Sequence, residues 1–576
     1  MHRSFPCCLL CVALLACGDD DGPSTTPMPD AGGDATDDAA PPPEDAGSDA
    51  GPRDWPPMTV PSSDEPAEGV VREVFTVAGS HPAANPMTGD ETPTELDHTT
   101  VVRYRAAGAP SARSVIVAMP GLLAGAGTWQ SLAIALVQRG ASGGGVEVWA
   151  IDRRGNLLED HRGTDTAEAA QDAEIAQGYY FGGDTIGGVA FEGLRTQGEL
   201  GYLSEWGLAT HVEDVRRVIA LVPEASRRGH VFLMGHSMGG TFTRAYAAWR
   251  FEDGTRGVDE LAGLIVVDGG GAAAGIDEEE YRAGGGGIGA LTNPGLDRIR
   301  ERTRFLELPI LGASALVRLH VIALRALYAP TEIIEDDPGR DRLSALLLSL
   351  GDDEVPRMTN RAVLGFALDD ASSAVTFAAC ALGSSSGGPL GQFTSPFGGA
   401  TLLQPTDPEA TYDWVDALDA EPAEWTPIEL LARSASEGRT DFTEWYFPLR
   451  LPLDLGAVGD GNLPEDGYFA AQGIRAFDGE LVDAPLLAIS SELVSVESYE
   501  AVGPLLAPIG EGRPAAGAGR DDERAFRVLD VPSMTHVDPL TAADRPENPV
   551  PDAITEFLAE HSEEGTVAVP TMEESR

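Results

Sequence analysis

One short segment of the chain has the residue types and spacing of a nucleophilic serine. Ser237 is the central residue of the sequence GHSMG, a G-x-S-x-G pattern that follows the apolar run 230–235 and precedes the helical pattern 241–250. In a strand–turn–helix of this kind, flanking glycines allow a tight turn. The turn holds the hydroxyl at a helix N-terminus, where developing negative charge is stabilised. The sequence therefore predicts Ser237 as a nucleophile for acyl transfer.

A histidine near the C-terminus is placed to activate that serine. A serine hydroxyl at neutral pH is a weak nucleophile and needs a base within hydrogen-bond reach. His536 follows the apolar run 525–531 and precedes a predicted helix around 554–560. The other histidines lie on predicted helix or strand edges, in loops without an evident role or near the chain ends, and their spacing suggests no metal site. We therefore predict His536 as the general base.

Acyl transfer also needs two backbone N–H groups that point at the oxygen of the tetrahedral intermediate. Met238, the residue after the serine, is expected to supply one of them. The apolar run 114–119 leads directly into Pro120, Gly121 and Leu122, where the glycine lets the chain approach a substrate closely. We assign the second N–H group to Leu122.

The predicted site residues stand at the ends of short apolar runs, which are typical of strands buried on both faces of a parallel sheet. The runs are 114–119, 146–152, 230–235, 261–268, 484–490 and 525–531. Helical patterns lie between most of them, and this alternation predicts an α/β fold with a doubly wound, mostly parallel sheet. The interval 269–483 is rich in helical segments, so we expect it to be a large cap inserted into the sheet.

Four segments of the chain together resemble the α/β-hydrolase superfamily, whose lipase and esterase members look closest. They are MPGL at 119–122, IDRRGNLLED at 151–160, GHSMGG at 235–240 and THVD at 535–538. The resemblance covers roughly residues 70–561 apart from the cap. It implies the sheet of that fold, the roles given above and a carboxylic acid that orients the histidine. The serine separates the chain from the dehalogenase and epoxide-hydrolase branches, which have an aspartate at that position.

The sequence departs from the family pattern at the acid. The superfamily usually has an aspartate after the seventh strand, but the segment that follows 484–490 contains none, and Glu492 is the nearest carboxylate. Asp268, at the end of the run 261–268, is the alternative, because some lipases of this fold have the acid there. We expect Glu492 to orient His536 and keep Asp268 as the alternative.

The N-terminus has the features of an export signal. Residues 1–17 combine a positive start with an apolar stretch too short to span a bilayer. The stretch ends in LLAC, which with the following glycine resembles the bacterial lipobox and implies lipidation of Cys17. We therefore expect an exported protein that is anchored by lipid to a bacterial membrane and faces the periplasm or the cell surface. Of the two bacterial membranes, we expect the outer one.

The expected organisation follows from these segments. The Asp-, Pro- and Ala-rich stretch 18–66 is too poor in large apolar residues to fold and is expected to be a disordered tether. The hydrolase core is expected in two parts, 67–268 and 484–564, separated by the cap or lid 269–483 and followed by a flexible tail, 565–576.

The expected function is cleavage of small-molecule or lipid carboxylic esters through an acyl-enzyme on Ser237, which needs neither a metal nor an organic cofactor. A formal net charge of −53 argues against a nucleic-acid partner and against binding to anionic lipid head groups, so the lipid anchor would be the only membrane contact. Two alternatives stay open: acyl transfer to an alcohol or amine, and a non-catalytic surface protein that keeps the fold for binding. The substrate, its acyl length and the oligomeric state are left open.

Overall fold

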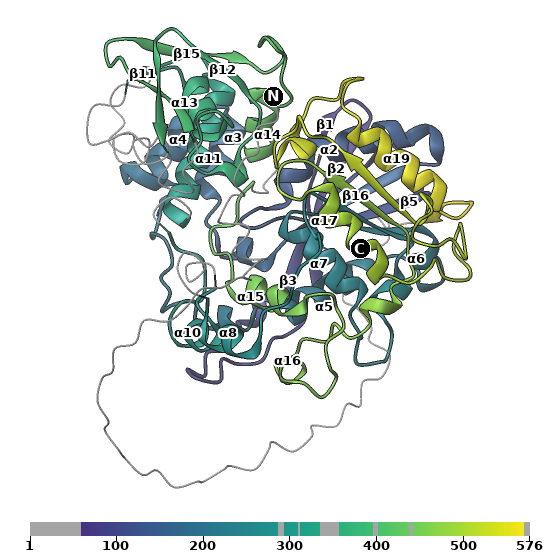
Figure 1. Ribbon diagram of the computed structural model, residues 1–576. Helices are drawn as coiled ribbons and strands as arrows, with labels where there is room; N and C mark the ends of the chain where they lie inside the picture. The colour runs from purple at the N-terminus through teal and green to yellow at the C-terminus, as the bar shows by residue number, and fades with distance from the viewer. Residues whose placement is uncertain are drawn as a thin grey trace, which may run out of the picture.

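The computed structural model describes residues 59–285, 293–308, 312–333, 356–394, 401–436 and 442–568. A nine-stranded sheet forms its centre (Figure 1). From one edge to the other the strands are β1 (Thr59–Ala67), β2 (Val70–Ala78), β3 (His98–Ala106), β6 (Val146–Asp152), β5 (Ser114–Met119), β9 (Val231–His236), β10 (Gly263–Val267), β16 (Leu486–Ser490) and β17 (Phe526–Asp530). The six strands from β6 to β17 are parallel, and this confirms the predicted α/β sheet.

The antiparallel edge of the sheet begins earlier than expected. The tether was predicted to run to residue 66, but β1 begins at Thr59 and pairs with β2 in antiparallel fashion. The Asp64 carboxylate of β1 forms an ion pair with the Arg72 guanidinium of β2. Polar and small residues fill β1 (TVPSSDEPA), so hydrophobic periodicity gives no signal for it. The predicted signal peptide, Cys17 and the rest of the tether lie outside the described residues. Within the described ranges, no helix has the length and apolar character needed to cross a membrane.

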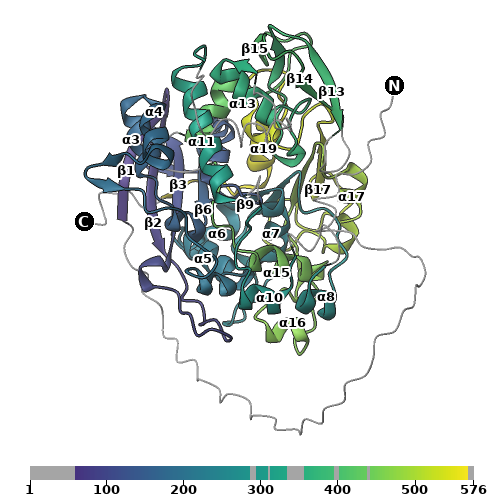
Figure 2. The ribbon, with the colours of Figure 1, turned by 90° about the vertical axis from the view of Figure 1, so that its left-hand side faces the viewer.

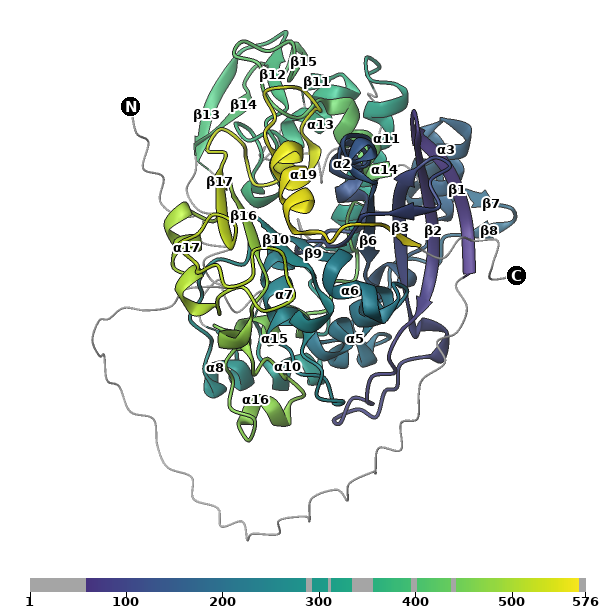
Figure 3. The ribbon, with the colours of Figure 1, turned by 90° about the vertical axis from the view of Figure 1, so that its right-hand side faces the viewer.

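Helices cover both faces of the sheet (Figure 3), and alternate residues of each buried strand pack into the two layers. On β5, Val115 and Val117 pack with α5 (Leu208–Ile219) and α7 (Met238–Ala247), whereas Ile116 and Ala118 pack with α2 (Gln130–Gly140) and α19 (Val550–His561). This two-residue period is the geometry of a strand covered on both faces. The sheet is therefore the rigid middle layer, and the residues that follow its strands are held at one edge.

The insertion between β10 and β16 forms two lobes at opposite ends of the molecule (Figure 2). The cap lobe is described at 312–333, 356–394 and 401–436. These residues form three helices, α11 (Ala313–Tyr328), α13 (Asn360–Leu368) and α14 (Ile428–Ser436), and five strands, β11 (Arg357–Met358), β12 (Gly383–Ser386), β13 (Leu390–Thr394), β14 (Thr401–Pro405) and β15 (Thr411–Asp416). The base lobe contains α8 (Glu278–Ala283), α10 (Leu296–Glu301), α15 (Arg450–Val458) and α16 (Tyr468–Ala471). The cap was expected to be helical, but its small sheets add a β layer.

The alternating burial of β15 explains why the cap lobe includes strands. Tyr412 and Trp414 are buried, while their neighbours are partly or fully exposed. Both rings contact Phe366 of α13 edge-on, with centroid distances of 6.0 and 5.3 Å. The cap lobe therefore has a small aromatic core of its own.

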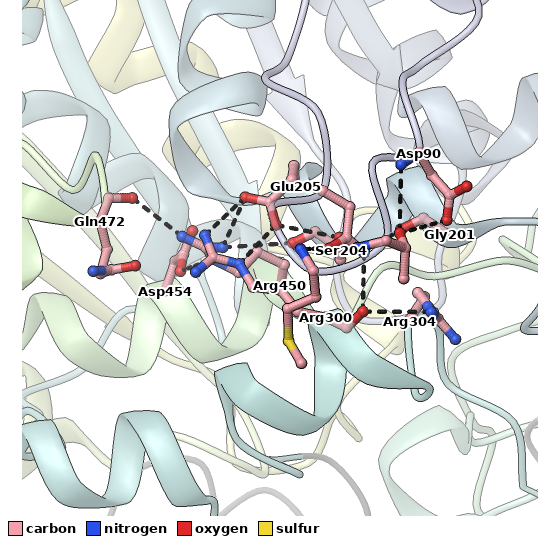
Figure 4. Close-up of polar contacts among 12 residues, drawn as sticks. Asp90, Gly201, Ser204, Glu205, Arg300, Arg304, Arg450, Asp454 and Gln472 are labelled. Atoms are coloured by element: carbon pink, nitrogen blue, oxygen red, sulfur yellow. Dashed lines mark hydrogen bonds and ion pairs between the residues drawn. The ribbon is translucent and has the colours of Figure 1, made fainter. Parts of the chain in front are cut away.

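Buried ion pairs join the base lobe to the hydrolase core (Figure 4). Arg450 of α15 donates hydrogen bonds to Asp454 at 2.6 Å and to Glu205 at 3.3 Å. Glu205 also accepts a hydrogen bond from Arg300 of α10 at 2.8 Å. Asp454 in turn accepts the Leu208 N–H at the start of α5 at 2.9 Å. Removing one member of such a network leaves an uncompensated buried charge, so the base lobe is a fixed part of the core.

Candidate active site

Ser237 occupies a strained turn between β9 and α7, as the motif predicts. Its backbone has φ 55° and ψ −124°, a conformation that costs a non-glycine residue about 1–3 kcal/mol. A Cβ on Gly235 would lie 1.9 Å from the Gly239 carbonyl oxygen, and a Cβ on Gly239 would lie 2.1 Å from the Met119 carbonyl oxygen. Both glycines are therefore required for the turn that presents the serine.

His536 lies in the loop between β17 and α18 (Asp538–Thr541), where the sequence predicted the base. Its ring is buried, and its Nδ1 lies 2.7 Å from Oδ2 of Asp268. Ser237 and His536 line the same cavity. Because the bond to Asp268 occupies Nδ1, Nε2 is the nitrogen left to accept a proton.

Asp268 follows β10 and is fully buried. Its carboxylate accepts the backbone N–H groups of Ser491, Leu493 and Val494 at 3.2, 2.9 and 2.8 Å, in addition to the His536 ring. Burial alone would raise the pKa of this carboxyl, but the hydrogen bond and charge of His536 and the backbone N–H groups outweigh burial and lower it. An ionised Asp268 therefore holds His536 in the tautomer with Nδ1 protonated.

The expectation that Glu492 orients the histidine ring is wrong. Its side chain is exposed, and its carboxylate accepts the backbone N–H of His536 at 3.3 Å rather than a ring nitrogen. The reason lies in the loop after β16, which turns the N–H groups of Ser491, Leu493 and Val494 toward Asp268. The alternative acid of the sequence analysis, Asp268, is the residue in contact with the ring.

Leu122 and Met238 lie beside the serine, in positions that suit the predicted oxyanion donors. Both line the cavity with Ser237 and His536. Met238 is the first residue of α7, so its N–H has no partner within the helix. A Cβ on Gly121 would lie 3.1 Å from the Cβ of Ser237, which shows how closely this loop approaches the nucleophile. The assignment of the two N–H groups remains a prediction.

The cavity above the serine has a volume of about 150 Å³ and mostly apolar walls. The cap lobe, the base lobe and the segment between them all contribute side chains, among them Leu316, Leu319, Leu368, Val375, Phe377, Phe442, Pro452 and Leu455. Apart from His236 and His536, no titratable side chain lines it in the part of the chain that is described. Such a cavity favours an uncharged, apolar group.

Sequence reasoning missed the role of His236, which it treated only as the residue beside the serine. Burial and the charge of His536 lower the pKa of His236 to about 3, so its ring is neutral at physiological pH. Its Nε2–H donates to the His536 carbonyl oxygen at 2.8 Å, and the two ring centroids are 4.5 Å apart. His236 therefore holds the histidine loop above the elbow.

Comparison with known proteins agrees with this geometry at the level of the fold. Residues 114–269, which include β5, the elbow and Asp268, match the family described as alpha/beta hydrolase fold. No curated protein matches the chain at a significant level.

Similar solved structures include lipases and an esterase. A putative lipase from Sulfolobus solfataricus is 14% identical, with 88% of this chain and 99% of that chain covered and a TM-score of 0.42. A monoglyceride lipase variant from Saccharomyces cerevisiae is 12% identical, with coverage of 88% and 97% and a TM-score of 0.29. A thermophilic esterase from Thermogutta terrifontis is 12% identical, with coverage of 84% and 99% and a TM-score of 0.27.

Proposed function

We propose that the protein, whose core has the α/β-hydrolase fold, is a serine hydrolase that cleaves carboxylic esters. One observation carries the proposal: the strained Ser237 and His536 line one apolar cavity, and Asp268 binds the His536 ring at Nδ1. A serine, a base and an acid that orients the base are the parts of an acyl-transfer site.

The reaction follows from these positions. His536 Nε2 takes the proton of Ser237, the oxygen attacks the ester carbonyl, and the N–H groups of Leu122 and Met238 hold the oxyanion. The alcohol leaves with the proton from His536. Water then attacks the acyl-enzyme with the same base and releases the acid. The ionised Asp268 stabilises the imidazolium that forms in each half of the reaction.

The cavity supports a substrate with an uncharged, apolar acyl group. A charged carboxylate or ammonium would find no Asp, Glu, Lys or Arg side chain among the described lining residues, so its desolvation would not be offset by an ion pair with one of these side chains. A cavity of about 150 Å³ holds a molecule of roughly the size of benzene. We therefore propose esters of short to medium apolar acids as the substrates.

We further propose that the protein is exported and anchored through a lipid on Cys17. The support is the LLAC sequence at the end of a short apolar stretch. Acyl chains contribute about 0.8 kcal/mol per buried methylene, so a multiply acylated cysteine would hold the protein on a membrane surface.

The test of the proposed reaction uses the intact protein and a matched pair of variants. Wild type should react with a fluorophosphonate probe and hydrolyse p-nitrophenyl butyrate, whereas Ser237→Ala should do neither and should keep its melting temperature. The control Ser226→Ala, in α6 (Glu224–His230), should behave as wild type. If Ser237→Ala hydrolyses the ester at more than a few per cent of the wild-type rate, the nucleophile is another group.

A further inference from the structure

Arg153 contacts the loop that carries Leu122 in an unusual way. The side chain is 1% exposed, and its guanidinium donates to the carbonyl oxygens of Pro120, Gly121 and Ala124, each at 2.8 Å. The planar group also lies over the Phe447 ring at 5.3 Å. Three backbone carbonyls of one short loop are therefore held by a single buried cation.

One of these contacts bears directly on the proposed oxyanion donor. The Gly121 carbonyl and the Leu122 N–H belong to the same planar, trans peptide unit, so they point in opposite directions. When Arg153 holds the carbonyl, the N–H is aimed away from Arg153. A cation on the carbonyl also polarises the unit and makes its N–H a stronger donor. Leu123, with φ 57°, shows that the loop is under strain that such contacts must maintain.

The insertion supplies the counter-charge for Arg153. Glu444 is fully buried, and its Oε2 accepts the Arg153 Nε–H at 2.8 Å. Its other oxygen, Oε1, has no hydrogen-bond partner among the described residues, so Arg153 is the partner of this carboxylate. The Glu444 N–H donates to the Leu123 carbonyl at 2.8 Å, and the Gly125 N–H donates to the Phe442 carbonyl at 3.0 Å. The segment 442–444 thus lies against the loop through an antiparallel β-bridge between Ala124 and Thr443.

We propose that Arg153 is a positioning residue for the oxyanion loop and that Glu444 makes the inserted segment part of this device. Arg153 orients and polarises the Gly121–Leu122 peptide, and Glu444 keeps the cation in place. Neither residue lines the cavity. Because the Leu122 N–H is needed most when the oxyanion forms, the pair acts on the transition state more than on substrate binding. The inference rests on the proposed serine chemistry.

The experiment compares Arg153→Lys, which keeps the charge but cannot bridge three carbonyls and a carboxylate, with Arg154→Lys. Arg154 is equally buried, but its guanidinium pairs with Asp214 at 2.6 Å and donates to the Ser80 carbonyl, so it does not hold the oxyanion loop. Active sites are titrated with the fluorophosphonate probe, so that kcat is counted per folded site. Removing one oxyanion donor costs about 10²–10³ in kcat, and misaligning it should cost roughly 10–100-fold.

The expected result for Arg153→Lys is a kcat 10–100-fold lower, a KM changed less than about threefold and a matching loss of affinity for a trifluoromethyl ketone. Arg154→Lys should keep its kcat per titrated site. Glu444→Gln keeps an acceptor for Nε but loses the charge, so its kcat should fall roughly five- to tenfold, and it serves if Arg153→Lys does not fold.

Two results overturn the inference. Either Arg153→Lys or Glu444→Gln with a kcat per titrated site within twofold of wild type would mean that the pair is only structural. An equal loss in Arg154→Lys would mean the same. If the wild type itself neither reacts with the probe nor hydrolyses the ester, the proposed function fails together with the inference; wild-type activity with an unaffected Arg153→Lys overturns the inference alone.

Discussion

Replacing Asp268 by asparagine tests the acid that the structure brings to His536. Each carboxylate oxygen accepts two donors: Oδ1 binds the N–H groups of Ser491 and Val494, and Oδ2 binds Leu493 N–H and the His536 ring. An asparagine must place its NH₂ group against one of these pairs. Whichever position it takes, donors face donors.

The less costly position decides the outcome for catalysis. At the Oδ1 position the NH₂ group opposes two backbone N–H groups, and neither can lose its proton. At the Oδ2 position it opposes only one, because His536 can move its proton from Nδ1 to Nε2. Each buried donor left without an acceptor costs about 1–3 kcal/mol, so the second arrangement is favoured by one such penalty. It leaves His536 protonated at Nε2, where it cannot take the proton of Ser237.

The expected loss is therefore that of a wrong tautomer, about 10⁴-fold in kcat in a serine protease triad, or about 5 kcal/mol of transition-state stabilisation. The assay is hydrolysis of p-nitrophenyl butyrate, with circular dichroism as the check on folding. Glu492→Gln is the control, because its amide oxygen still accepts the His536 backbone N–H, and it should stay within about threefold of wild type. A folded Asp268→Asn protein with more than a tenth of wild-type activity, or a crippled Glu492→Gln, would refute the reasoning.

Three further predictions concern the cavity, the cap lobe and the anchor. Leu316→Trp should fill part of the cavity and lower kcat/KM for p-nitrophenyl octanoate at least about tenfold, while kcat/KM for p-nitrophenyl acetate stays unchanged. Equal losses on both esters would contradict the cavity assignment. Burial, opposed by the Gly383 N–H and reinforced by the charges of Asp370 and Asp538, raises the pKa of Glu424 to about 7. A raised pKa favours the protonated carboxyl in the folded state, so Glu424 costs stability as pH rises from about 4.5 through 7. Glu424→Gln should therefore melt at a higher temperature than wild type at pH 8 and at the same temperature at pH 4, below the unfolded-state pKa, and a difference independent of pH would rule this out. Cys17→Ser should abolish palmitate incorporation and move the protein from the membrane to the soluble fraction, and unchanged labelling would exclude Cys17 as the lipidated residue.

The sheet and its elbow were predictable because their signals are local. Each parallel strand is a short apolar run. Ser237 lies in a five-residue motif, and the tight turn requires the glycines at both ends of that motif. His536 was found from its place after the last apolar run. β1 was missed because its side chains carry no hydrophobic pattern.

The acid could not be chosen from the sequence, because the choice depends on the direction in which a loop turns its N–H groups. Glu492 and Asp268 both follow buried strands, and only the three-dimensional path after β16 separates them. The pair of Arg153 and Glu444 was missed for a different reason: its members are 291 positions apart and neither belongs to a periodic pattern. No motif in the sequence links these two positions.

The place of the insertion also sets the order in which the protein can assemble. Val267 at the end of β10 pairs with Ile489 of β16, so the whole insertion must be enclosed before this part of the sheet forms. Closing a loop of that length costs roughly 5 kcal/mol of chain entropy, which is offset only when the contacts between β10 and β16 form. A chain truncated before residue 484 contains the strands before the insertion and the elbow but lacks residues 491–494 and His536. We expect such a truncated chain to lack hydrolytic activity, because His536 and the N–H groups that hold Asp268 belong to the missing part.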